Sequence, residues 1–352
     1  MKVLASVEYV RVRRIGAGQG RNSVVFLADD THIAGRVVVK EIAKSQFPDP
    51  SVFFGEAQAM YAAAAASVVP VHWAAETADK ICIAMPHYPA GSLADRIRVS
   101  PLSVPEAKRI CQDICAGARA AHSAGVCHLD IKPTNVFFDA SGRALVADFG
   151  QSVRLDATGV YSGPMRLYTP YLPPEVITAR AVSPGSDVYQ IGLTLYRALN
   201  GDGHFKQQLA GMGGADLRSA IAAGTFPART FLPHLPSAVC RVLKRALAAN
   251  PPDRFQSAAE LAEAFAAISA PHAWRVDMSR PPVTRWRLDR PPRASLEVIR
   301  KPGLGKSRWN IEVWTIGSKG RRRRRDQDTL WKAERTERQA HIALKRCFRL
   351  LP

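Results

Sequence analysis

The segment from His128 to Gly150 constrains this 352-residue chain more than any other. It reads HLDIKPTNVFF, then a short turn DASGR, then ALVADFG, and it gathers Asp130, Lys132, Asn135 and Asp148. Two carboxylates, an amide and an ammonium supply a base for an incoming hydroxyl, oxygen ligands for magnesium and a cation for a transferred phosphate. We therefore expect this segment to carry phosphoryl-transfer chemistry.

The spacing of these residues makes the expectation more specific. The pattern D-x-K-x-x-N followed by D-F-G resembles the catalytic and metal-binding loops of protein kinases. The resemblance implies that Asp130 is the general base, that Lys132 stabilises charge on the γ-phosphate of ATP, and that Asn135 and Asp148 hold Mg²⁺. Lysine at position 132 resembles the serine/threonine branch of the family, so a protein hydroxyl is the expected acceptor.

A glycine-rich segment lies near the N-terminus, in GAGQGRNSVVFLA. Read as G-x-G-x-x-S-x-V, it places Gly18, Gly20, Ser23 and Val25 at the positions of the kinase glycine loop, whose backbone N–H groups approach the nucleotide phosphates. Serine stands where the third glycine is expected, and we interpret this small residue as tolerable. A glycine-rich hairpin turn with no ligand is the alternative.

A lysine and a glutamate follow at a separation that suits an ion pair. Lys40 ends the β-branched run RVVVK, and Glu56 is the first acid of the Ala-rich helix expected after it. The resemblance implies that Lys40 holds the α- and β-phosphates and that Glu56 pairs with it, because a desolvated ammonium is costly when unpaired. An edge-strand lysine and an ordinary surface glutamate are the alternatives.

The adenine-binding residues are expected where the strand KICIAM ends. In the kinase resemblance Met85 lies beside the adenine, and residues 86–88 form the hinge between two lobes. Pro86 is acceptable because its position supplies only a carbonyl, whereas the N–H donor would come from Tyr88.

The order of the expected elements predicts an α+β, bilobal protein-kinase fold over residues 1–270. The N-terminal lobe (1–85) would hold a five-stranded antiparallel sheet and one helix, with strands at 68–74 and 80–85 among the five. The C-terminal lobe (86–270) would be mainly helical, beginning with a long amphipathic helix over 105–124.

Three further positions match the part of a kinase that receives the protein substrate. The segment TPYLPPE ends at Glu175, which would pair with Arg254, and Asp187 would bond the backbone of the catalytic loop.

Leu129 departs from the pattern, because many kinases have an arginine at this position that pairs with a phosphate on the activation loop. We therefore expect activity that does not depend on phosphorylation of that loop.

The last part of the chain is strongly basic. Residues 271–352 hold 22 of the 49 Lys and Arg residues but only 8 of the 30 Asp and Glu residues. We expect residues 271–295, with two Pro-Pro pairs, to form an extended linker, and residues 296–352 to form a small ββα-like extension. A solvated charge run, a nucleic-acid-binding surface and a surface for an acidic protein partner remain open for this region.

Composition and the termini indicate a folded cytoplasmic protein. Hydrophobic residues make up 47% of the chain, which is enough for a sizeable core. The N-terminus lacks the apolar segment of a signal peptide, and the most apolar run, residues 62–71, is too short to span a bilayer. The six cysteines form no C-x-x-C pair, so reduced thiols are expected.

The sequence thus favours an ATP- and Mg²⁺-dependent serine/threonine protein kinase with a basic extension. Two other functions remain open. One is a nucleotide-binding scaffold, resembling a pseudokinase, that acts through its basic tail. The other is a kinase of related fold that acts on a small molecule, which the P-P-E segment with Asp187 and Arg254 disfavours.

Overall fold

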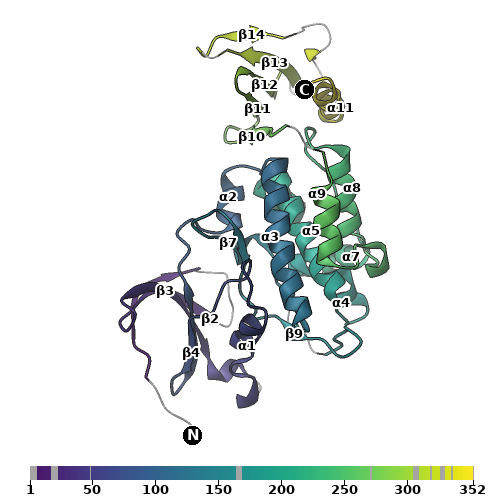
Figure 1. Ribbon diagram of the computed structural model, residues 1–352. Coiled ribbons are helices and arrows are strands. Elements are labelled where there is room, and N and C mark those ends of the chain that lie inside the picture. The colour runs from purple at the N-terminus through teal and green to yellow at the C-terminus, as the bar shows by residue number, and fades with distance from the viewer. Residues whose placement is uncertain are drawn as a thin grey trace.

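The computed structural model describes residues 6–16, 23–47, 49–163, 169–269, 272–303, 309–317, 319–325, 330–333 and 336–351. Two lobes and a C-terminal domain follow one another along the chain. Figure 1 shows the C-terminal domain at the end of the helical lobe, on the side away from the N-terminal lobe.

The N-terminal lobe (N-lobe) is built on a five-stranded antiparallel sheet in the order β1-β2-β3-β5-β4. The β-branched run of β3 lies at the centre of this sheet, where Val37 and Val39 are buried. The lobe contains β1 (Tyr9–Ile15), β2 (Ser23–Asp30), β3 (Gly35–Ala43), α1 (Gly55–Ala62), β4 (Trp73–Glu76) and β5 (Lys80–Pro86).

The strand expected over 68–74 begins later than predicted, at Trp73. The valines before it serve another contact, because Val68 forms a bridge with Val146 and the Val69 N–H donates to the Val146 carbonyl at 2.9 Å. Pro70 follows these residues and has no N–H to offer to a ladder. The segment therefore joins the two lobes rather than lengthening β4.

The C-terminal lobe (C-lobe) packs its helices around α3 and α5. Apolar residues recur on one face of each helix, and both helices begin with a capping box, at Ser103 and Ser183. Gly117 lets α3 approach the backbone of Ser67, since a Cβ there would lie 2.6 Å from the Ser67 carbonyl oxygen. The helices are α2 (Leu93–Val99), α3 (Val104–Ser123), α4 (Pro174–Thr178), α5 (Pro184–Asn200), α6 (Asp202–Leu209), α7 (Gly214–Ala222), α8 (Ser237–Ala246) and α9 (Ala258–Ala266).

Two short antiparallel strand pairs carry the loops between α3 and α4. Strand β6 (Val126–Cys127) pairs with β9 (Val153–Arg154), and β7 (Val136–Phe138) forms a hairpin with β8 (Ala144–Val146). The turn of this hairpin is DASGR, as the sequence predicts. The β6–β9 pair flanks the segment from His128 to Gly150, and the hairpin lies within it.

The extended linker expected over residues 271–295 is wrong, because these residues belong to the C-terminal domain. Residues 271–295 contain two strands, and the pairs Pro281–Pro282 and Pro291–Pro292 lie in the turns before and after the second of them. Proline is common in turns, and the alternation of TRWRLDR between buried and exposed residues is that of a strand. The domain is a five-stranded antiparallel sheet of β10 (Arg275–Asp277), β11 (Thr284–Arg290), β12 (Arg293–Pro302), β13 (Trp309–Ile316) and β14 (Arg322–Arg324), with α11 (Glu337–Leu350) on one face.

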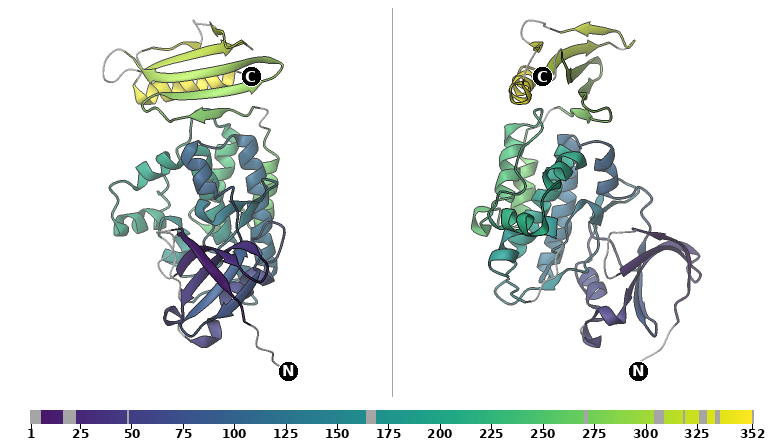
Figure 2. Two further views of the ribbon diagram at one scale, coloured as in Figure 1. Left: turned by 90° about the vertical axis from the view of Figure 1, so that its left-hand side faces the viewer. Right: turned by 180° about the vertical axis from the view of Figure 1, so that it is seen from behind.

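The two strands and the helix of the expected ββα extension are therefore present as β12, β13 and α11, within a larger unit. Figure 2 shows this sheet in front of α11 in its left-hand view. The core between them includes Trp286, Val298, Val313 and Leu344. With three more strands than expected, the domain buries a core of its own.

Candidate active site

Lys40, Glu56 and Asp148 meet at the junction of the lobes. The Lys40 Nζ lies 2.7 Å from Glu56 Oε1 and 2.7 Å from Asp148 Oδ1. Strand β3 supplies the lysine, α1 the glutamate, and the turn after β8 the aspartate. The separation of Lys40 from Glu56 along the chain thus predicts a contact that the structure contains.

The charged side chains at this junction shift each other's pKa values. Burial alone would lower the pKa of Lys40, but the carboxylates of Asp148 and Glu56 raise it above its ordinary value. Burial would raise the pKa of Asp148, and the Lys40 ammonium lowers it to about 2. At neutral pH the structure therefore holds an ammonium against an ionised carboxylate.

Gly150 is required by the close approach of these three side chains. A Cβ at this position would lie 3.0 Å from Lys40 Nζ and 3.1 Å from an oxygen of both Asp148 and Glu56. Any larger side chain would press on the charged cluster, which explains why glycine ends the segment.

The loop of residues 128–135 between β6 and β7, called the catalytic loop after its resemblance to that of kinases, brings Asp130, Lys132 and Asn135 together. Lys132 Nζ donates to both oxygens of Asp130 at 2.8 Å. The amide nitrogen of Asn135 donates to Asp130 Oδ2 at 2.8 Å and to its backbone carbonyl at 3.0 Å. Burial raises the pKa of Asp130, against the opposing charge of Lys132. The carboxylate is thus poised to accept a proton at a higher pH than an ordinary aspartate.

His128 contacts the backbone on both sides of the site. Its ring is buried, with Nδ1 accepting from the Asp130 N–H at 3.2 Å and Nε2 facing the Ala147 carbonyl at 3.1 Å. This pattern fits a neutral ring that donates from Nε2, and burial lowers the pKa of His128 accordingly. The imidazole links the catalytic loop to the strand that precedes Asp148.

Helix α5 holds the backbone of the catalytic loop. Asp187 accepts from the N–H groups of His128 and Leu129 at 2.9 and 2.8 Å and from His122 Nε2 at 2.7 Å. Leu129 has a positive φ of 60°, and Asp148 has one of 67°. Such values are uncommon for residues other than glycine and persist where neighbouring contacts fix them, often at functional sites.

Sequence reasoning missed two residues that support this loop from the same helix. The amide nitrogen of Gln190 donates to the carbonyls of Leu129 and Tyr171 at 2.8 and 3.1 Å, and its oxygen accepts from the Ile131 N–H at 2.9 Å. Thr194 donates to the Ile131 carbonyl at 3.1 Å. A signal existed, because residues 187, 190 and 194 share one face of a helix and all three are polar.

The residues expected beside the adenine lie at the end of β5 and directly after it. Met85 and Tyr88 pack against a buried cluster that includes Phe149, and the Tyr88 ring lies 6.2 Å from that of Phe137. Val25 of β2 pairs directly with Lys40 of β3, and Ser23 begins β2. Gly18 and Gly20 lie outside the residues that the structure describes.

The donor set fits a hard divalent cation. Asp148 is ionised, and its Oδ2 accepts no hydrogen bond from the described part of the chain. Asn135 directs its nitrogen to Asp130 and keeps its amide oxygen as an acceptor. Carboxylate and amide oxygens are the ligands that Mg²⁺ prefers, so these two side chains are suited to hold it.

The segment after Gly150 is anchored at both of its described ends. Tyr161 forms a β-bridge with Val182, and Leu129 packs with Cys127 and Val182 in a buried apolar cluster. Beyond it, Arg254 is fully buried and donates to both oxygens of Glu175 at 2.9 and 2.6 Å. The expected pair of Glu175 with Arg254 is therefore present.

Comparison with known proteins agrees with this geometry. A family model described as protein kinase domain matches residues 9–265. The chain is 30% identical over 270 residues to serine/threonine-protein kinase PknJ of Mycobacterium tuberculosis, which covers 73% of this chain and 45% of PknJ. It is 29% identical over 265 residues to PknE of Mycobacterium bovis (74% and 46%) and 30% identical over 273 residues to PknA of M. tuberculosis (74% and 61%). The chain spans about half the length of the first two relatives, and the family match ends before the C-terminal domain.

Proposed function

This chain belongs to the protein kinase family, and from that membership we propose that it transfers the γ-phosphoryl group of ATP to a serine or threonine hydroxyl of a protein. The observation that carries the proposal is the pair of linked clusters, Lys40–Glu56–Asp148 and Asp130–Lys132–Asn135. All six of these positions carry the side chain that the kinase pattern requires, which favours catalysis over the scaffold function.

Asp130 is the group that orients the acceptor hydroxyl and takes its proton. Its Oδ2 is held by Asn135, and both oxygens are held by Lys132, so the carboxylate keeps one orientation. Lys132 lies where it can also face the negative charge of the phosphoryl group. Catalysis of this kind comes mostly from positioning and charge neutralisation.

Mg²⁺, when bound, would neutralise charge on the nucleotide phosphates. Asn135 and Asp148 are the residues proposed to hold it, through oxygen. Lys40 is proposed to hold the α- and β-phosphates, with Glu56 keeping the ammonium in place. Gly18, Gly20, Ser23 and Val25 are proposed to cover the phosphates, and Met85, Pro86 and Tyr88 to bind the adenine.

Activity is proposed to be independent of phosphorylation of the activation loop. The support is Leu129, whose buried side chain occupies the place from which an arginine would reach a phosphate. Packing of Leu129 with Val182, together with the bridge of Tyr161 to Val182, contributes apolar and backbone contacts that hold the described part of the segment.

A cytoplasmic location remains part of the proposal. All six cysteines are free thiols, which suits a reducing compartment. Within the described residues, no helix is long and apolar enough to cross a membrane.

The test is transfer of labelled phosphate from ATP to generic protein substrates, with wild type compared to Lys40→Ala and Asp148→Ala. Wild type should label protein at serine or threonine. Each variant should lose at least about a hundredfold, because Lys40→Ala removes the charge proposed to hold the α- and β-phosphates and Asp148→Ala removes a proposed ligand of Mg²⁺. Absence of transfer by wild type, or transfer that survives both substitutions, would refute the proposal.

A further inference from the structure

The C-terminal domain presents one covered and one open face of its sheet. Trp286, Val298 and Val313 are cross-strand neighbours and pack in the core against α11. Successive side chains on a strand point to opposite faces, so the residues next to these three face away from α11. We call this side the open face, and the left-hand view of Figure 2 looks toward it.

One row of side chains crosses the whole open face. Arg275 pairs with Arg287, Arg287 with Glu297, Glu297 with Trp314, and Trp314 with Arg324. The row contains a residue of every strand from β10 to β14, so at the spacing of neighbouring strands it is roughly 19 Å long. Three of its five members are arginines, and all three are exposed.

Three of the acidic residues on this face are already in ion pairs. Glu297 is paired with Arg322 at 2.7 Å, Asp289 with Arg287 at 2.8 Å, and Glu312 with Lys301 at 2.6 Å. By contrast, neither Arg275 nor Arg285 forms an ion pair with another described residue, although their charges lower the pKa of Asp289 and Asp277. Strand β14 adds exposed arginines along the edge of the sheet. The open face therefore carries more basic than acidic side chains.

An aromatic cluster lies at the β14 end of the row. The rings of Trp314 and Trp331 have centroids 5.3 Å apart, and the Arg324 guanidinium lies 4.4 Å from the Trp331 centroid. Both indoles are only partly buried. Indole rings and guanidinium planes are the surfaces on which unpaired bases stack.

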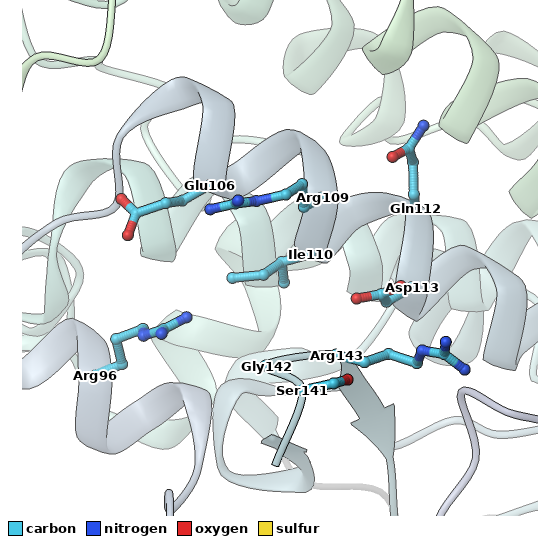
Figure 3. Close-up of a pocket in the computed structure, with 9 residues that line it drawn as sticks. All are labelled: Arg96, Glu106, Arg109, Ile110, Gln112, Asp113, Ser141, Gly142 and Arg143. Carbon is cyan, nitrogen blue, oxygen red and sulfur yellow. The ribbon is translucent and has the colours of Figure 1, made fainter. Parts of the chain in front are cut away.

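The β10 end of the row adjoins the C-lobe. Ser100 donates its hydroxyl to the Val276 carbonyl at 2.7 Å, which places β10 beside the chain between α2 and α3. A cavity of about 420 Å³ opens there between α2, α3 and the β7–β8 turn, and Figure 3 shows three arginines among its lining residues: Arg96, Arg109 and Arg143.

Glu106 lines this cavity and lies near an arginine of the C-lobe and an arginine of the C-terminal domain. Burial would raise its pKa, but hydrogen bonds from Ser103, and then the charges of Arg96 and Arg275, hold the pKa below its ordinary value. An arginine of the C-terminal sheet and an arginine of the C-lobe thus act on the same carboxylate. The basic row is continued toward the C-lobe rather than ending at β10.

We propose that the open face binds single-stranded nucleic acid, with phosphates on Arg275, Arg287 and Arg324 and bases stacked at Trp314 and Trp331. This function is separate from phosphoryl transfer. Arginines in a row supply the phosphate contacts. The indole cluster favours unpaired bases over the acidic side chains of a protein, because carboxylates have no flat ring to stack. The same cluster disfavours a duplex, whose bases are already stacked on one another.

The test is fluorescence anisotropy of the full chain with labelled oligouridylate, oligothymidylate and a DNA duplex, each of about 15 nucleotides per strand, near the upper end of known site sizes. Both single strands should bind more tightly than the duplex, because only their bases are free to stack on the indoles. The plot of log affinity against log salt should fall by about 0.7 for every phosphate contact. Absence of binding at low salt, or tighter binding of the duplex, would overturn the proposal.

A pair of variants locates the site. Arg287→Gln/Arg324→Gln should weaken single-strand binding at least about tenfold and reduce the salt slope by about 1.4, since two contacts are removed. The control Arg119→Gln/Arg218→Gln removes the same charge from exposed positions of α3 and α7 and should bind as wild type does. Thermal unfolding of both variants should match that of wild type.

Two outcomes separate this site from general attraction to polyanions. Equal weakening in both variants would show that net charge alone holds the oligonucleotide, and the proposal would fail. Displacement by polyglutamate at the same concentration as by unlabelled oligonucleotide would instead assign the face to an acidic protein. Asp148→Ala should keep full oligonucleotide binding, so that loss of kinase activity and loss of this function are distinguishable.

Discussion

At the scale of single residues, Leu129 is the basis of the proposal that activity does not depend on phosphorylation of the activation loop. It precedes the proposed base Asp130, its φ of 60° is fixed by Asp187, and its side chain is buried with Cys127 and Val182. An arginine could not take this place without burying a charge, which is costly when unpaired. The residue therefore supports a loop that is held by packing.

The corresponding prediction concerns the hydroxyls of the segment after Gly150. Ser152→Ala, Thr158→Ala and Ser162→Ala should each leave turnover within about threefold of wild type, because Leu129 stands where the arginine that receives such a phosphate is expected. Steady-state transfer to a protein substrate is the measurement. A large loss in any variant that is restored by a phosphate mimic at the same position would contradict the account. The same criterion applies to Thr169.

At the scale of elements, a buried ion pair within the C-lobe joins α4 to the chain before α9. Arg254 donates to Glu175 and also to the carbonyls of Gly185, Ala248 and Ala249, at 2.6–3.0 Å. Five hydrogen bonds satisfy the guanidinium completely, which is what a fully buried arginine requires. The pair fixes the segment that ends in P-P-E against α5.

Loss of this arginine should be severely destabilising. Arg254→Met leaves the Glu175 carboxylate buried without its cation, and breaking a buried pair costs about 3–5 kcal/mol. Urea unfolding should show that loss, whereas Arg241→Met, on the exposed side of α8, should change the free energy of unfolding by less than about 0.5 kcal/mol. Similar values for the two variants would show that the pair does not stabilise the lobe.

Most elements of the two lobes could be predicted because their sequence patterns are local. The 3.6-residue period of α3, the alternation of β1 and the proline-first starts of α3 and α5 are all visible in the chain. The contacts of Gln190 and Thr194 could not be assigned, because they depend on where α5 crosses the catalytic loop. Spacing within a motif predicts a site, whereas support from a distant helix requires the fold.

At the scale of the whole molecule, the C-terminal domain is attached to the C-lobe through aromatic side chains. His234 is buried between Trp286, whose Nε1 donates to its Nδ1 at 3.1 Å, and the ring of Phe348, at a centroid distance of 5.9 Å. This contact could not be predicted from the sequence, because the Pro-Pro pairs suggested an unstructured linker. The proline pairs lie in turns, and the domain is a folded part of the molecule.

Burial lowers the pKa of His234 to about 3, against an ordinary value of 6.5. Between these values the unfolded chain binds a proton that the folded chain does not, so stability falls as the pH falls. From pH 7 to pH 5 the loss attributable to His234 should be about 2 kcal/mol. Urea unfolding of wild type and His234→Gln at both pH values measures it, because glutamine can still accept from Trp286 but does not titrate. An equal pH dependence in the two proteins would contradict the assignment.

The central claim is that Asp130 serves as the base of a phosphoryl-transfer site, and its removal tests that claim most directly. Asp130→Asn keeps the size of the side chain and its contact with Asn135 but removes the acceptor for the hydroxyl proton. The account predicts that transfer from labelled ATP to protein falls at least about a hundredfold, as for loss of a general base, while ATP binding measured by calorimetry stays within about threefold of wild type. Transfer at the wild-type rate by Asp130→Asn would contradict it.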